Sequence, residues 1–143
     1  MTLHILTAIF IIGPLAAMTV TAPRLVRLGR PGLAGLRGAL ATVRWLSVGS
    51  IVTAGLGFSL VHKGSFGSVR SLSDTWLSAS IVLWVVAVLV NLGVVAPALN
   101  RAARDVEDYG DGRRHLPALV LGGSLTALCW ALIVVLMTVK PGT

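Results

Sequence analysis

The sequence predicts an all-α membrane protein whose four helices cross the bilayer as two similar hairpins. Three observations predict this fold: four long apolar runs, a composition far from that of soluble domains, and arginines gathered in two alternate loops. Of the 143 residues, 55% are hydrophobic and 12% are charged, and the mean hydropathy is +0.89. Soluble globular domains carry about 25% charged residues, so the composition excludes that class.

The four apolar runs cover residues 3–23, 45–61, 76–99 and 116–139. A helix needs roughly 17 to 25 residues to cross a hydrocarbon core of about 30 Å, and each run meets that length. We therefore expect a single four-helix transmembrane domain over residues 1–143. The first run is not expected to be a cleaved signal peptide, because no basic residue precedes it.

Arginines mark one side of the predicted bundle. The connection between the first two runs holds five of them and no acid: Arg24, Arg27, Arg30, Arg37 and Arg44. Residues 100–115 add four more, so nine of the twelve basic residues lie on one side. The positive-inside rule assigns that side to the cytoplasm and places both termini outside. We expect these arginines to fix the topology or to contact lipid headgroups.

The same charge pattern narrows the cellular setting. Arginine outnumbers lysine by ten to two in a chain rich in Ala, Gly, Val and Leu, which favours a bacterial inner membrane. A nucleic-acid partner is not expected, since the sequence offers no soluble surface of mixed basic and aromatic residues.

Apolar residues at helical spacing predict a short amphipathic helix over residues 33–44, after the helix-breaking sequence Gly-Arg-Pro-Gly at 29–32. We expect this helix to lie at the cytoplasmic interface before the chain turns into the second span. The segment 100–115 carries both charge signs and is expected to be a solvated connector with a turn at 109–112.

An internal repeat relates the two predicted hairpins. At an offset of 74 positions, identical residues coincide at Pro23 and Pro97, Arg27 and Arg101, Arg30 and Arg104, and Gly49 and Gly123. Hairpins repeated at this offset would enter the membrane in the same orientation, as a parallel repeat.

Small residues recur every four positions in the second and fourth spans. The two stripes are Gly49, Thr53 and Gly57, and Gly123, Ala127 and Ala131. Such stripes let helix backbones approach closely in lipid. They predict either an internal seam of the bundle or a docking surface for other membrane subunits or a second copy.

Few polar groups lie at membrane depth. Asn91, in the third span, is expected to hydrogen-bond a neighbouring helix. No Asp, Glu, Lys or Arg lies inside a span, which disfavours a proton-coupled transporter and an intramembrane hydrolase. Cys129 is the only cysteine and is expected to pack as a small apolar group.

Two histidines are the candidate ligands. His4 begins the first span and His62 ends the second, so both are expected at the outer face. Imidazoles on neighbouring antiparallel helices can ligate a haem iron or a metal ion. The two histidines can equally be polar rings at the membrane interface that bind no ligand. Both interpretations, ligand binding and interfacial placement, stay open. His115 lies at the opposite face.

Several short motifs resemble a superfamily of small bacterial four-helix membrane proteins. They are Leu3-His4, Gly13, Pro23-Arg24-Leu25, Trp76-Leu77, Ala79, Pro97 and Lys140-Pro141-Gly142. The superfamily includes CopD-type copper-resistance proteins, HemJ-type protoporphyrinogen oxidases and a related uncharacterised family, which the chain resembles most.

The resemblance implies a four-helix fold and, by likeness to HemJ-type enzymes, haem b ligation by His4. Those enzymes also need a lysine near the start of the third span, where this chain has Ser78 and Ser80. Copper importers of the CopD type are rich in methionine or histidine, whereas Met1, Met18 and Met137 are scattered here.

The sequence therefore favours a non-catalytic accessory subunit of a larger transport or respiratory membrane complex. A haem-binding redox or haem-handling protein that uses His4, with or without His62, is the alternative. A small copper or solute transporter is a weaker one.

Overall fold

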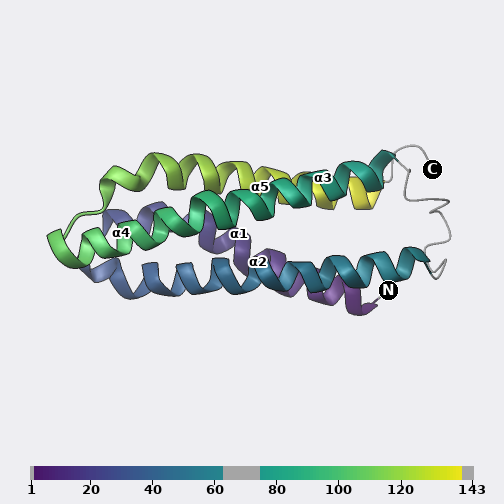
Figure 1. Cartoon of the computed structure of the whole chain (residues 1–143), viewed down its shortest axis with the longest axis horizontal. Helices are drawn as coiled ribbons and strands as arrows, with labels where there is room; N and C mark the ends of the chain where they lie inside the picture. Colours follow the sequence, from purple (N-terminus) through teal and green to yellow (C-terminus); the bar gives the residue numbers. More distant parts are fainter. Residues whose placement is uncertain (1, 63–74, 140–143) are drawn as a thin grey trace.

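The computed structural model describes residues 2–62 and 75–139, and side chains within 5–59 and 75–139. These residues form four long helical rods (Figure 1). Three rods are single helices: α1 (Thr2–Arg27), α2 (Leu33–His62) and α5 (Leu116–Val139). The remaining rod joins α3 (Thr75–Val90), the π-helical turn η2 (Asn91–Val95) and α4 (Ala96–Tyr109). All four rods are long and apolar enough to cross a membrane, as the sequence predicts.

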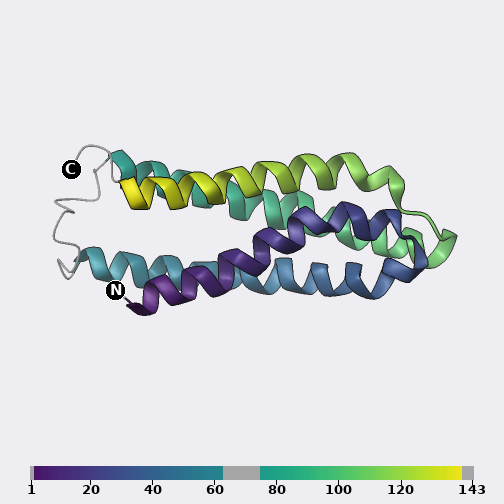
Figure 2. The same cartoon turned by 180° about the vertical axis from the view of Figure 1, so that it is seen from behind.

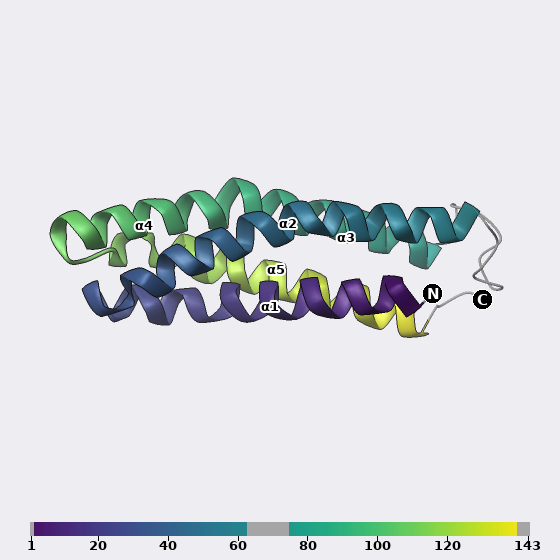
Figure 3. The ribbon, with the colours of Figure 1, turned by 90° about the horizontal axis from the view of Figure 1, so that it is seen from below.

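The rods pack side by side as a bundle. α1 packs against α2 and α5, α3 packs against α5, and α2 packs against α4. Figure 2 shows α1 crossing one face of the bundle obliquely, and Figure 3 shows α2 rising from the layer of α1 and α5 to that of α3 and α4. α1 begins and α5 ends at the same end of the bundle. The opposite end therefore holds both the α1–α2 turn and the α4–α5 turn.

The third rod changes helical geometry where its sequence contains a proline. Pro97 has no N–H to donate to the carbonyl of Gly93 one turn earlier, and its ring crowds that carbonyl. The chain widens into η2, where the N–H of Ala96 bonds the carbonyl of Asn91 five residues back. π-Bulges of this kind often occur at functional positions in helices. The bulge places Asn91 in the interior, with no exposed surface.

The predicted interfacial helix over 33–44 is the beginning of α2, which continues to His62 without a break. Its apolar positions do form one helical face, but that face turns into the bundle: Leu36, Ala39 and Val43 are fully buried. Inward packing between helices therefore replaces the lipid contact expected for this segment. At 30 residues, α2 is about 45 Å long and exceeds the hydrocarbon thickness of about 30 Å.

The connector expected over 100–115 is helical as far as Tyr109, a difference from the prediction. Its alanines and Val106 recur at helical spacing and are buried against the bundle, which the mixture of charges in the sequence conceals. The turn predicted at 109–112 is present, because Gly110 ends α4 in the left-handed conformation at φ 78°. Gly29 follows α1 with a different positive-φ conformation, at φ 66° and ψ −138°. An L-residue with a side chain rarely adopts either conformation.

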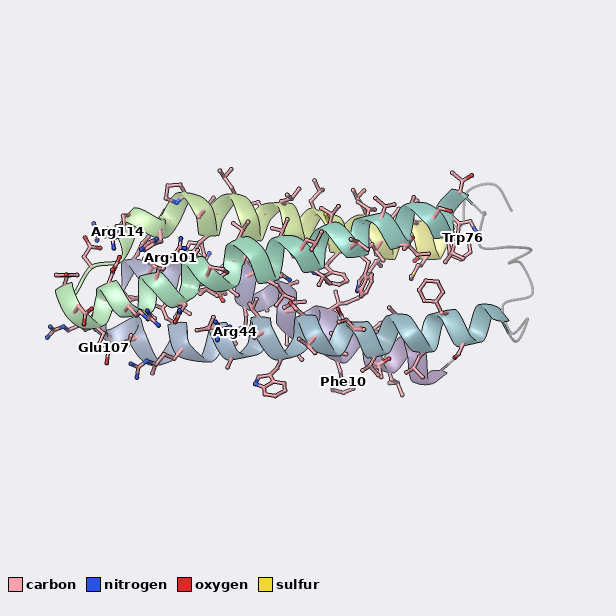
Figure 4. The ribbon with its side chains drawn as sticks, viewed as in Figure 1. Phe10, Arg44, Trp76, Arg101, Glu107 and Arg114 are labelled. Carbon is pink, nitrogen blue, oxygen red and sulfur yellow. The ribbon has the colours of Figure 1, made fainter. Side chains whose placement is uncertain are left out.

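The best-packed part of the bundle is the arginine-rich end. Val26, Leu36, Val43, Leu99 and Val106 are each at most 1% exposed. Small residues interleave with them, so the backbones of α1, α2 and α4 approach closely. Figure 4 places Arg101, Glu107 and Arg114 around this end, whereas Phe10 and Trp76 lie toward the other.

Candidate functional site

The two candidate haem ligands lie on neighbouring helices at one end of the bundle. α1 includes residue 4 near its start, and α2 ends at His62. α1 and α2 pack together and run in opposite directions, so the backbones of the two histidines are at the same end. The side chains of His4 and His62 are outside the described residues.

Asn91 is the most deeply placed polar side chain of the interior. It has no exposed surface, and neither its amide nitrogen nor its amide oxygen has a hydrogen-bond partner among the described residues. The interhelical hydrogen bond expected from the sequence is therefore not formed. The buried hydroxyls of Thr19 and Thr126 instead donate to carbonyls of their own helices, at 2.9 and 2.7 Å.

Two other interior hydroxyls, those of Ser50 and Ser80, are satisfied in the same way. Ser50 donates to the carbonyl of Ser47 at 2.6 Å, and Ser80 donates to the carbonyl of Trp76 at 2.8 Å. This local bonding follows the preference of Ser and Thr in membrane helices. The Ser50 hydroxyl also takes part in a bond between helices: the indole N–H of Trp84 on α3 donates to it at 3.1 Å. This polar contact links α2 to α3.

The residues of the two predicted small-residue stripes differ in how deeply they are buried. In α2, Thr53 is buried, while Gly49 and Gly57 are half-buried. In α5, Gly123 is buried, Ala127 is half-buried and Ala131 is exposed. The α5 stripe thus begins inside the bundle at the arginine-rich end and turns outward along the helix, whereas the α2 stripe is most buried at its middle residue.

The closest helix contact involves Gly123 and its neighbour Gly122. A Cβ added to Gly123 would lie 2.8 Å from the backbone oxygen of Thr19 on α1. That oxygen lacks the usual helical donor, because residue 23 is proline and has no N–H. A Cβ added to Gly122 would lie 2.9 Å from Val95. The two glycines therefore let α5 contact α1 on one side and the π-helical turn on the other.

A third small-residue stripe lies on the outside of the bundle and was not singled out in the sequence. Gly13, Ala17 and Thr21 of α1 are spaced by four residues and are all exposed. The four-residue spacing of these small residues is the signal in the sequence that could have identified the stripe. Residues 5–14 of the same helix contain no buried side chain, so this half of α1 contributes little to the internal core.

The arginines predicted to lie at the membrane surface are all exposed: Arg24, Arg27, Arg30, Arg37 and Arg44. Arg37 donates to a carboxylate oxygen of Glu107 at 2.6 Å and so ties α2 to α4. Both partners are more than half exposed, which makes this ion pair worth about 0–1 kcal/mol.

A second ionic cluster, which sequence reasoning missed, joins α4 to the turn before α5. Asp105 is only 8% exposed and accepts two hydrogen bonds from the Arg114 guanidinium, at 2.6 and 2.8 Å. The His115 ring nitrogen Nε2 lies 2.7 Å from the same carboxylate. Such bidentate pairing is the stronger and more directional form of an ion pair. The cluster is a structural clamp, since no nucleophile is part of it.

Acidic side chains near this clamp do not assemble into a metal centre. Among the side chains of residues 5–59 and 75–139, no group of three His, Cys, Asp or Glu could hold a metal ion. Cys129 is buried, as expected for a packing residue. Comparison of the chain with protein families, curated proteins and solved structures found no match in any of the three.

Proposed function

We propose that this protein is a non-catalytic accessory subunit that binds a larger membrane complex through the exposed face of α1. The observation that carries the proposal is the surface of α1 between residues 5 and 21. None of the side chains of residues 5–14 is buried, and Gly13, Ala17 and Thr21 form an outward stripe. Stripes of this kind are typical of the close helix contacts that hold membrane proteins together.

The environment of Gly13 supports an external partner over an internal packing role. A Cβ added to Gly13 would meet no atom within 4 Å, whereas one at Gly123 would strike the backbone of α1. Glycine is therefore not needed at position 13 by the bundle itself. Thr21 donates its hydroxyl to the carbonyl of Ala17 at 2.8 Å, so it adds no unpaired polar group to the surface.

The proposed setting is a bacterial inner membrane with the arginine-rich end in the cytoplasm and both termini outside. The arginines at the α1–α2 and α4–α5 turns support this orientation. The offset repeat supports an origin of the two hairpins, α1–α2 and α3–α5, from one ancestral unit. The partner is then another membrane subunit, of a transport or respiratory complex, or a second copy of this chain.

Co-purification tests the proposal directly. The tagged protein is solubilised mildly from native membranes, and the proteins that accompany it are identified by mass spectrometry. We expect Gly13→Leu to lose a partner that the unchanged protein retains, because the larger side chain separates the two backbones. Gly55→Leu is the matched control, since Gly55 is also exposed and a Cβ there meets no atom within 4 Å. Isolation of the unchanged protein as a lone 14.9 kDa chain would contradict the proposal.

The alternative is a haem-b-binding protein that uses His4, with or without His62. It is favoured by the common position of the two residues at one end of the packed α1–α2 pair. Protein purified from haem-replete cells should then show a Soret band that weakens in His4→Ala. A preparation without the band, or a band that His4→Ala leaves unchanged, would exclude His4 as a ligand.

A further inference from the structure

A hollow runs along the contact between α1 and α5. Its volume is about 250 Å³, and its walls are mixed: Val20 and Pro23 of α1 and Leu119 and Val120 of α5 supply an apolar part, beside polar groups of both helices. It forms beside the point where Gly123 approaches the backbone of Thr19. Arg24 and Arg27 line the end of the hollow that is nearer the α1–α2 turn.

A second hollow of about 430 Å³ lies between the α1–α2 turn and the α4–α5 turn. Arg27 lines both hollows, so the two lie next to each other. Arg113 lines the second hollow from the other turn, together with the positive-φ residues Gly29 and Gly110. The two turns meet here, because a Cβ added to Gly29 would lie 3.1 Å from the carbonyl oxygen of Gly110.

The charge of the combined surface is strongly positive. Three guanidinium groups and one carboxylate, that of Asp111, line the two hollows. Asp111 already accepts the backbone N–H of Arg113 at 3.0 Å, and the Arg113 side chain lies 3.9 Å from it. Arg24 and Arg27 form no ion pair with any described residue, in contrast to Arg37 and Arg114. Their positive charge is available to an external anion.

We propose that these hollows bind one anionic phospholipid, with its phosphate at Arg24, Arg27 and Arg113 and an acyl chain along the α1–α5 groove. Basic pockets at the ends of transmembrane helices recognise anionic headgroups in this way, and guanidinium groups suit phosphate geometry. The apolar groove favours a lipid over free phosphate, because a free ion would leave Val20, Leu119 and Val120 without a partner. The site goes beyond the proposed docking role of α1: it adjoins the end of the outward stripe at Thr21, but none of Gly13, Ala17 and Thr21 lines it.

Lipid binding to the full-length protein in detergent tests the headgroup part. Phosphatidylglycerol and phosphatidylcholine are added in separate titrations, and the bound lipids are counted by native mass spectrometry. We expect phosphatidylglycerol to bind in preference, and Arg27→Gln to weaken it about fivefold, the effect of one basic group near an anionic surface. Arg44→Gln removes the same charge from an exposed residue outside both hollows and should keep the affinity. Equal affinities of the two variants would overturn the proposal.

The acyl-chain part needs a different pair of variants. Val120→Trp fills the groove, whereas Leu121→Trp adds the same bulk to an exposed residue that does not line it. We expect only Val120→Trp to reduce retention of phosphatidylglycerol. Soluble glycerol 3-phosphate serves as the probe without an acyl chain and should bind at least tenfold more weakly. Equal retention by the two tryptophan variants, or equal binding of glycerol 3-phosphate, would show that no acyl chain occupies the groove.

Discussion

At the residue scale, Asn91 is the feature that the fold itself does not account for. Its amide is fully buried, at a π-helical turn, and is unpaired among the described residues. A buried polar group without a partner costs about 1–3 kcal/mol. The bundle would be more stable with an apolar side chain of similar size here, so the asparagine imposes a cost on folding.

We therefore expect Asn91→Leu to raise the free energy of unfolding by about 1–3 kcal/mol. Leucine has the same branched shape and number of heavy atoms, with bulkier methyl groups, and it removes the unpaired amide, whereas Asn91→Ala leaves a cavity and should stabilise less or destabilise. Thermal unfolding of the purified protein in detergent, followed by tryptophan fluorescence, measures the difference. Destabilisation by Asn91→Leu would mean that the amide binds a group, such as an ordered water, that holds the helices together.

The burial and ion pairing of Asp105 could not be predicted from the sequence. Its neighbours Glu107 and Asp108 are exposed, and the linear sequence does not distinguish the three. Only the continuation of α4 through residue 109 turns Asp105 inward and brings it to Arg114 and His115. The prediction of a connector here missed the helix because charge was given more weight than the spacing of the buried alanines.

At the scale of elements, the sequence predicted the four helices because each contains a long apolar run, a signal that does not depend on tertiary contacts. It could not predict how far they extend beyond the apolar runs. α2 begins 12 residues before the expected span, at Leu33, because Leu36 and Val43 find partners inside the bundle. How far a helix continues in this way depends on the neighbouring helices that it packs against. The local sequence pattern therefore does not predict it.

The contact between α1 and α5 is expected to depend on Gly123. A Cβ at this position would lie 2.8 Å from a backbone oxygen of Thr19, which cannot move without the whole of α1. We expect Gly123→Ala to lower the free energy of unfolding by about 1–3 kcal/mol, the usual cost of overpacking. Thermal unfolding in detergent measures this loss.

Gly38 provides the matched control for that substitution. It lies in α2, and a Cβ added there would meet no atom within 4 Å. Gly38→Ala should therefore stabilise the helix by up to about 1 kcal/mol, through helix propensity alone. If both alanine variants gain stability, α1 and α5 do not depend on backbone contact at Gly123.

At the scale of the whole molecule, the distribution of charge and packing defines two unlike ends. The arginine-rich end is closely packed and clamped by the Arg37–Glu107 and Arg114–Asp105 pairs. Toward the other end, α1 contributes no buried side chain over residues 5–14 and α2 none over 54–59. Under the proposed function, this less buried half of α1 and α2 is the part that meets a partner or lipid.

The orientation of these two ends is itself testable. Lone cysteines are introduced at Tyr109, which is 80% exposed at the end of α4, or at Val139, which is 68% exposed at the end of α5. Both variants also carry Cys129→Ala, which removes the natural thiol. If the arginine-rich end is cytoplasmic, a membrane-impermeant maleimide added to intact cells should label Val139→Cys and leave Tyr109→Cys unlabelled until the cells are lysed. The reverse pattern would place the arginines outside, against the positive-inside rule, and would put the proposed phospholipid site in the outer leaflet.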